Sequence, residues 1–385
     1  MRHYSFLSDL DRRRLFLREP QSFNADSDPL LVASALGATL YCPATRDTLA
    51  TDLARQAADG VVSMVACLED AIADDDVAAA ERHLVGELRQ AARSGSGLPL
   101  VFVRVRNPTQ ITMLADALGD DAGALTGFVL PKFGEEHGPE FLDAVVDASE
   151  HLGRRLYAMP VVESHEAIFA ETRIEALHGM RRVVDKYRDH VLAVRIGATD
   201  LSSAYGLRRS RDLTIYDVRV VADAIADIVN VFSRAYSGNV VTGPVWEYFS
   251  RSERIFKPQL RESPFVEHAD AALRAALIAA DLDGLIREVS LDQANGLLGK
   301  TVIHPSHVPA VHALSVVSCE EFADAADVLA TGATGGATSS AYGNKMNESK
   351  PHTAWAQRTL TRSRMFGVAR EGVSFVDLLG AGLRP

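Results

Sequence analysis

Short apolar segments rich in β-branched residues alternate along the chain with longer segments in which apolar residues recur at helical spacing. The first pattern predicts buried strands, and the second predicts helices with one apolar face. Helical segments such as 74–95 and 216–236 separate most of the strand candidates. Eight segments have the strand pattern: 38–44, 61–70, 100–106, 127–132, 156–163, 191–200, 239–245 and 300–305. Eight strands alternating with helices predict an α/β fold of the (β/α)8 TIM-barrel type. A doubly wound open sheet is the alternative, but no glycine-rich dinucleotide fingerprint follows the first strand.

The two ends of the chain depart from this alternation. We expect an N-terminal extension with helices over residues 1–37, a catalytic barrel over 38–315 and a C-terminal helical lid segment over 316–385. Within the last segment, residues 331–344 contain too few apolar side chains to build a core, which predicts a hinge or a mobile lid. A long loop rich in aromatic and basic residues is expected over 244–265, after the seventh strand.

Composition limits the class of partner. The 385 residues carry 51 acidic and 40 basic side chains, for a net charge of −11, which argues against nucleic acid and anionic membranes as partners. No apolar run approaches the length of a membrane helix, and the charged N-terminus lacks the apolar core of a signal peptide. Three widely spaced cysteines without a CxxC pair favour a reducing compartment and no zinc site. We therefore expect a cytoplasmic enzyme that acts on a small molecule.

Ionisable residues stand at the end of nearly every predicted strand. Catalytic groups of a TIM barrel lie at these carboxyl ends, which meet at one mouth although they are far apart in the sequence. A single such residue would more often cap a helix or form a surface salt bridge, but this number predicts a shared site. The residues are Glu69, Asp70, Arg104, Arg106, Lys132, Glu163, Asp200 and His304. Strand alternation is expected to direct only one of Glu69 and Asp70 to the barrel centre.

Seven sequence motifs carry a more specific signal. In chain order they are LYCPATRDTLATDLARQAADGV, ACLEDAI, FVRVRNP, FVLPKF, MPVVES, RIGATDLSSAYG and GKTVIHPSHV. Together they resemble the citrate lyase β-subunit and HpcH–HpaI aldolase family over roughly residues 38–310. The long N-terminus, an insertion around 173–190 and the loop at 244–265 are more similar to the divergent C–C bond lyase branch associated with bacterial tellurium-resistance gene clusters.

The resemblance implies a magnesium-dependent carbon–carbon lyase or aldolase. Glu163 and Asp200 match the family's metal ligands, and two carboxylates completed by water and substrate oxygens suit Mg²⁺, with Mn²⁺ as the other candidate ion. Arg104 matches the arginine that contacts the substrate carbonyl or enolate. Glu69 and Asp70 match acidic residues that lie beside the metal and orient its waters.

Each of the remaining candidate residues has two alternative roles. Arg106 takes the role of Arg104 if the strand register is shifted. Lys132 either binds a substrate carboxylate or neutralises the acidic mouth, and Arg46 either anchors a substrate phosphate or carboxylate or is simply exposed. Glu348, in YGNKMNESKPH, matches the family's lid acid, which reaches over a neighbouring subunit, or is a solvated charge. The family implies homo-oligomers, trimers or their multiples.

The expected reaction cleaves a 2-oxo or hydroxy carboxylic acid through an enolate. A first alternative is an acyl-CoA lyase or thioesterase of the malyl-CoA or citramalyl-CoA type, in which Arg208, Arg209 and Arg211 would line a groove for the CoA phosphates. A second alternative is a non-catalytic barrel that serves in binding or assembly.

Overall fold

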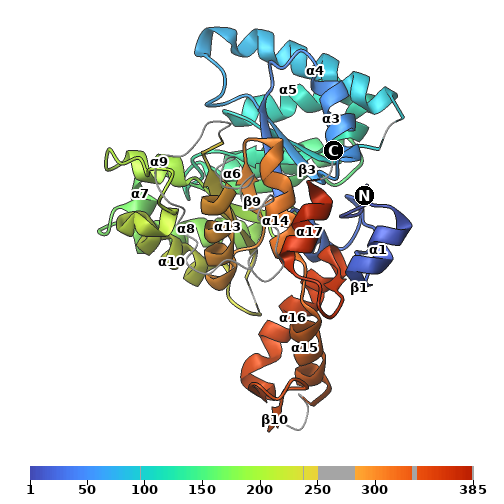
Figure 1. Ribbon diagram of the computed structural model, residues 1–385. Helices are drawn as coiled ribbons and strands as arrows, with labels where there is room; N and C mark the ends of the chain where they lie inside the picture. The colour runs from blue at the N-terminus through green and yellow to red at the C-terminus, as the bar shows by residue number, and fades with distance from the viewer. Residues whose placement is uncertain (96, 237, 250–281, 332–335, 384–385) are drawn as a thin grey trace.

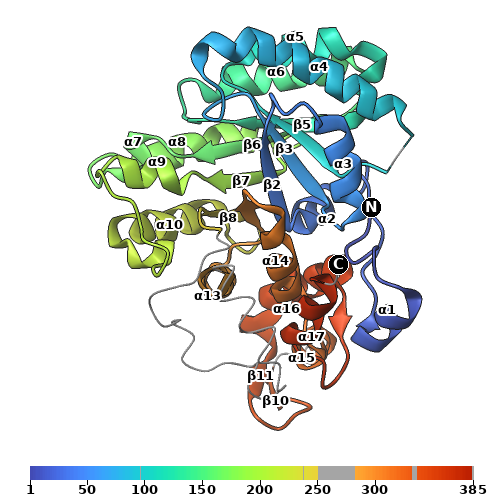
Figure 2. The same ribbon diagram turned by 45° about the horizontal axis from the view of Figure 1, so that its top comes forward.

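The centre of the molecule is a closed barrel of eight parallel strands, seen in the computed structural model in Figures 1 and 2. Adjacent strands follow chain order, and β9 closes the barrel against β2. The strands are β2 (Ala38–Pro43), β3 (Ser63–Cys67), β4 (Leu100–Arg104), β5 (Leu125–Leu130), β6 (Tyr157–Val162), β7 (Ala193–Ile196), β8 (Val240–Trp246) and β9 (Lys300–Val302). All eight correspond to predicted strands, so the predicted TIM barrel is confirmed. The structure describes residues 1–95, 97–236, 238–249, 282–331 and 336–383.

Helices surround the barrel, as Figure 2 shows for those between β3 and β8. They are α3 (Leu49–Ala58), α4 (Val77–Arg93), α5 (Pro108–Leu118), α6 (Gly138–His151), α7 (His165–Ile168), α8 (Arg173–Lys186), α9 (Ala198–Ser203), α10 (Arg219–Phe232), α13 (Leu282–Ala294) and α14 (Val308–Ser315). Local sequence fixes their ends. The side chain of Asn107 accepts a hydrogen bond from the backbone N–H of Gln110, and Pro108 occupies the first turn of α5. Such a cap starts the helix directly after the end of β4.

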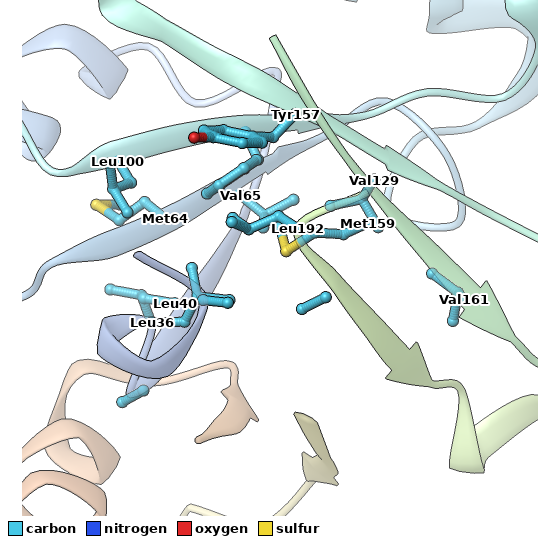
Figure 3. Packing of buried hydrophobic residues seen from close by; sticks show 14 of the residues in the cluster. Leu36, Leu40, Met64, Val65, Leu100, Val129, Tyr157, Met159, Val161 and Leu192 are labelled. Atoms are coloured by element: carbon cyan, nitrogen blue, oxygen red, sulfur yellow. The ribbon is translucent and has the colours of Figure 1, made fainter. Parts of the chain in front are cut away.

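The barrel strands are buried on both faces, as expected for a parallel sheet covered by helices. Strands β5 and β6 illustrate the packing. Val129 on β5 lies opposite Met159 on β6 in the strand pairing, and their side chains lie close together in Figure 3. Leu36 and Leu40 belong to the same core, where the N-terminal extension enters the barrel. The core thus holds the carboxyl ends of the strands in fixed positions relative to one another.

Both chain ends pack on the barrel. The N-terminal elements are α1 (Asp9–Leu15), β1 (Phe16–Arg18) and α2 (Pro29–Ala35), and the C-terminal ones are α15 (Cys319–Thr331), β10 (Ala337–Ser339), β11 (Met346–Glu348), α16 (Ser349–Phe366), β12 (Val368–Ala369) and α17 (Phe375–Gly382). Strand β1 pairs antiparallel with β12, and α17 packs against α14. In Figure 1, α15 and α16 extend away from the barrel and carry the β10–β11 hairpin at their tip.

Residues 331–344 were expected to form a hinge or a mobile lid, because they contain few apolar side chains. Part of this segment forms strand β10, which that composition did not predict. The expected division at 37 and 315 and the lid role of the last segment stay predictions. Most of the loop expected at 244–265 lies outside the described residues. Among the helices that the structure describes, none combines the length and apolar character needed to cross a membrane.

Candidate active site

Arg104 connects three carboxylates at the mouth of the barrel. It is the last residue of β4, and its Nη2 lies 2.7 Å from Glu69 Oε2, 3.0 Å from Glu163 Oε1 and 3.2 Å from Asp70 Oδ2. These charge-assisted contacts hold the side chains of three different strand ends together. The acids around it raise the pKa of Arg104, although its burial acts in the opposite direction. The guanidinium therefore stays charged.

Glu163 follows β6, and its side chain is fully buried. Its Oε1 accepts a hydrogen bond from the backbone N–H of Lys132 at 2.8 Å, whereas Oε2 has no hydrogen-bond partner in the described part of the chain. Burial, assisted by the nearby charge of Asp200, raises the pKa of Glu163 to about 7, against the effect of Arg104. A buried, unpartnered carboxylate oxygen is costly unless a ligand meets it.

Glu69 and Asp70 both lie within ion-pair distance of Arg104, but the Glu69 side chain is 7% exposed and the Asp70 side chain 56%. That strand alternation directs only one of them to the barrel centre stays a prediction, because β3 already ends at Cys67. Burial and the neighbouring Glu69 raise the pKa of Asp70 to about 6. Burial also acts to raise the pKa of Glu69, but hydrogen bonds from its neighbours and the charge of Arg104 hold that pKa below its ordinary value.

Lys132 supports the cluster with its backbone and its side chain. Its φ of 46° lies in the left-handed region, which is uncommon for a residue other than glycine. This conformation accompanies the hydrogen bond that its backbone N–H donates to Glu163, and strain of this kind is often found at functional sites. The Nζ atom lies 3.0 Å from Glu69 Oε1, and the side chain is 60% exposed. Lys132 thus neutralises part of the acidic mouth.

Asp200 lies in the first turn of α9, where it is half-buried. Its charge acts on Glu163, Asp70 and Lys132, which places it at the same mouth. Among the described residues, this cluster then combines the four carboxylates of Glu69, Asp70, Glu163 and Asp200 with the two cations of Arg104 and Lys132. A divalent cation would balance this excess, and the free Oε2 of Glu163 offers it a ligand.

The described residues contain no group of three His, Cys, Asp or Glu side chains arranged to hold a metal ion by themselves. An ion bound to Glu163 and Asp200 would consequently depend on water and substrate oxygens for its other ligands. Mg²⁺ is commonly bound in this way, through one or two carboxylates. The residues present therefore fit the expected ion.

A cavity of about 630 Å³ opens beside the cluster and is lined by Glu69, Asp70, Lys132 and Arg106, among others. Arg106 does not join the contacts of Arg104. Its Nε donates to the backbone oxygen of Leu68 at 2.8 Å, and Nη1 pairs with Asp74. Arg106 thus braces the loop after β3, next to the cavity.

Like Arg106, the predicted residues Arg46 and Glu348 lie outside the contacts of Arg104. Arg46, in the loop after β2, pairs with Asp52, and its side chain is half exposed. Glu348 ends β11 in the hairpin that projects from the barrel in Figure 1, and it is exposed. Its backbone N–H donates to His352 at 3.2 Å. Within one chain, the described contacts do not bring Glu348 to Arg104.

The chain matches the family model described as C-C_Bond_Lyase of the TIM-barrel fold over residues 30–368. It belongs to the C–C bond lyase family. Family membership confirms the expectation of a carbon–carbon bond lyase with a TIM-barrel fold. None of the curated protein sequences compared with this family member matches it significantly.

Many solved structures share the fold of this C–C bond lyase family member, and two of them illustrate the likeness. A citrate lyase from Burkholderia xenovorans LB400 is 18% identical, with a TM-score of 0.59, and the alignment covers 91% of this chain and 96% of that chain. The protein CitE from Mycobacterium tuberculosis, solved in complex with magnesium, acetoacetate and coenzyme A, is 22% identical, with a TM-score of 0.53. That alignment covers 86% of this chain and 99% of the CitE chain.

The sequence did not single out a buried ionic network that joins β9 to α13. Lys300 Nζ, at the start of β9, lies 2.9 Å from Glu288 Oε1 and 2.7 Å from Asp292 Oδ2 on α13. Glu288 also pairs with Arg209, and Tyr216 donates a hydrogen bond to Asp292 at 2.8 Å. Burial raises the pKa of Asp292 to about 6. The network fixes α13 and the segment after α9 to the barrel wall.

Proposed function

We propose that the protein is a Mg²⁺-dependent lyase or aldolase that cleaves a 2-oxo or hydroxy carboxylic acid through an enolate. The observation that carries the proposal is the arrangement of Arg104 beside Glu163, whose second oxygen has no partner in the described chain. Glu163 and Asp200 would hold the ion. When bound, the ion would act as a Lewis acid and orient the substrate's oxygens.

The residues of the chain have separate tasks in this reaction. Arg104 binds the substrate oxygen on which negative charge develops, because its guanidinium is fixed by its contacts and remains charged. Asp70, whose pKa is raised to about 6, accepts or returns a proton near neutral pH. Glu69 fixes Arg104 and Lys132, so that both cations point to the mouth.

Calorimetric titration with Mg²⁺ tests the site. Glu163→Gln and Asp200→Asn should each weaken Mg²⁺ binding by at least about tenfold, since each removes a charged ligand. Asp185→Asn is a suitable control, because Asp185 pairs with Arg181 and Arg188 on the surface of α8. Wild-type affinity in both Glu163→Gln and Asp200→Asn would contradict the proposed site.

Solvent exchange tests the enolate without knowledge of the complete substrate. An enzyme that forms the enolate of pyruvate exchanges the methyl protons for deuterium in D₂O, which proton NMR detects. We expect exchange with wild-type protein and Mg²⁺, and a loss of at least about a hundredfold in Arg104→Met, where the oxyanion partner is missing. Exchange at the uncatalysed rate with pyruvate and oxaloacetate, despite bound Mg²⁺, would contradict the proposed reaction.

An acyl-CoA substrate is the second candidate, because the related CitE structure contains coenzyme A and a cavity of about 440 Å³ lies beside α9. Arg208 and Arg209 line this cavity, but Arg209 is already paired with the buried Glu288. Because Arg209 is occupied by this ion pair, fewer arginines can bind the CoA phosphates than the three that the sequence suggested. A larger increase of the melting temperature with CoA than with pyruvate, both with Mg²⁺, would favour this candidate.

The lid acid and the assembly belong to the same proposal. Because Glu348 lies on the projecting hairpin, it would serve the mouth of a neighbouring subunit in a homo-oligomer, a trimer or its multiple. The N-terminal elements α1 and α2 and the long α8 between β6 and β7 support placement in the branch associated with tellurium-resistance gene clusters.

A further inference from the structure

An arginine lies inside the barrel below the acidic cluster. Arg195, on β7, is 2% exposed. Its Nη1 lies 3.4 Å from Thr39 Oγ1 and 3.8 Å from Met159 Sδ, and its Nη2 donates to Thr301 Oγ1. Among the residues that the structure describes, no carboxylate lies within ion-pair distance of this guanidinium. Within the described part of the chain, its positive charge is therefore met by neutral groups.

Tyr41 connects this arginine with the cluster above it. The Arg195 guanidinium carbon lies 5.4 Å from the centre of the Tyr41 ring, which is within the range of a cation–π contact. Tyr41 lies two residues after Thr39 on β2, so both side chains point into the barrel. The charges of Arg104 and Glu163 act on the phenol as well, and the side chain is half-buried. The guanidinium groups of Arg195 and Arg104 thus both act on the Tyr41 phenol.

Hydrophobic packing does not require this arrangement. The interior of a TIM barrel is usually filled by branched apolar side chains, and burying a charge without a counter-ion is costly. The cost is offset if an anion enters from the mouth, because the two guanidinium groups attract it and a phenol hydroxyl can donate to it. The four acids lie higher, at the strand ends, where a metal ion would balance them.

We propose that Tyr41 is a substrate-binding residue, whose hydroxyl donates a hydrogen bond to the carboxylate of a small 2-oxo acid, and that Arg195 is the positioning residue that holds the phenol. This inference rests on the proposed function and extends it, because it assigns the anionic end of the substrate to the barrel interior. Arg195 acts through Tyr41, since its own donors are directed to Thr39 and Thr301.

The variant Tyr41→Phe tests the hydroxyl, because it keeps the ring and its contact with Arg195. At saturating Mg²⁺, calorimetry should show that pyruvate and oxaloacetate bind about tenfold more weakly than to wild type, the usual effect of losing one hydrogen bond to a charged group. Mg²⁺ affinity without either acid should be unchanged. Tyr236→Phe is the matched control, because Tyr236 is 78% exposed.

The variant Arg195→Lys tests the positioning role, because it keeps the charge and loses the planar fork. Pyruvate binding to wild type should perturb the tyrosine ultraviolet difference spectrum, and this signal should disappear in Tyr41→Phe and weaken in Arg195→Lys. The double variant should bind pyruvate no more weakly than Tyr41→Phe, since Arg195 acts through the phenol. An additive loss in the double variant would overturn the positioning role.

The two proposals fail in different ways. If wild type binds Mg²⁺ and either acid, and Tyr41→Phe binds that acid equally well, the role of Tyr41 is overturned while the proposed function stands. If wild type binds Mg²⁺ but neither acid, both are overturned, and if it does not bind Mg²⁺, the metal site itself is overturned.

Discussion

The carboxylate of Glu163 occupies the space beside the α-carbon of Gly197. A Cβ atom at residue 197 would lie 2.2 Å from Glu163 Oε2 and 2.4 Å from its Cβ, much closer than real Cβ contacts. Gly197 stands directly after β7 and three residues before Asp200. The close approach therefore couples the position of one proposed ligand to the segment that carries the other.

Gly197→Ala should displace Glu163 and weaken Mg²⁺ binding by about tenfold or more, an effect comparable to the loss of a supporting contact around a metal. The backbone itself accommodates alanine, since φ at residue 197 is −90°. Calorimetry with Mg²⁺ measures the effect, and circular dichroism checks the fold. Gly86→Ala is the matched control, because an added Cβ on that residue meets nothing within 4 Å. Equal Mg²⁺ affinity in both variants would show that Glu163 is not a ligand.

Mg²⁺ affinity should rise with pH between about pH 6 and about pH 8, because a bound carboxylate must be deprotonated. Burial raises the pKa of Glu163 to about 7, so at pH 6 most of this group carries a proton that the ion must displace. Below this pKa, protons compete with Mg²⁺ for Glu163 and lower the Mg²⁺ affinity, and above it this competition ends. Mg²⁺ titrations in two buffers of different ionisation enthalpy should show proton release near neutral pH.

The Asp70→Asn variant is the control for this pH dependence. The pKa of Asp70 is raised to about 6, so this group also titrates close to the same range. If Glu163 is the ligand, the rise in affinity persists in Asp70→Asn with its midpoint near that of wild type. A flat profile in wild type would instead mean that the ion does not contact the group with the raised pKa.

The barrel and most members of the cluster could be predicted from the sequence, and the reasons are physical. Parallel strands covered by helices are apolar on both faces, which makes segments such as 100–106 recognisable. The ends of those strands must meet at one mouth, which brings Arg104 and Glu163 together from positions 59 residues apart. The separate behaviour of Arg106 was harder to predict, because β4 ends at Arg104 and the chain turns there.

Other parts of the site depend on contacts that local patterns do not encode. Arg195 lies within an apolar strand, and only the closed barrel shows that its side chain points inward to Tyr41. Lys300 stands in the GKTVIHP motif, but its partners Glu288 and Asp292 come from α13. The sequence pattern did not show that the side of this helix that carries the two acids packs against the barrel. The sequence signal for both was a charged residue inside a predicted strand.

Lys300→Met should lower the free energy of unfolding by about 3–5 kcal/mol, because it leaves the buried carboxylate of Asp292 without its cation. Urea denaturation followed by circular dichroism measures this loss. Combining Lys300→Met with Asp292→Leu should restore part of the stability, since the unpaired charge is removed. Arg182→Met, at an exposed pair with Glu135, is the control and should leave the free energy of unfolding nearly unchanged. An equally small effect of Lys300→Met would show that the network is not a structural support.

Glu348 should complete the site of a second subunit, and mixed oligomers can demonstrate this. Glu348→Gln and Glu163→Gln are each expected to reduce pyruvate proton exchange strongly, the first by removing the proposed lid acid and the second by removing a metal ligand. In a mixture refolded or exchanged to equilibrium, some mouths combine an intact Glu163 with an intact Glu348 from the neighbour, so activity should recover to a substantial fraction of wild type. Recovery requires that the two residues act across subunits, because each chain alone carries one defect. Failure to recover in oligomers that mass spectrometry shows to be mixed would overturn the action of Glu348 across subunits, and full exchange by Glu348→Gln alone would place this residue outside the reaction.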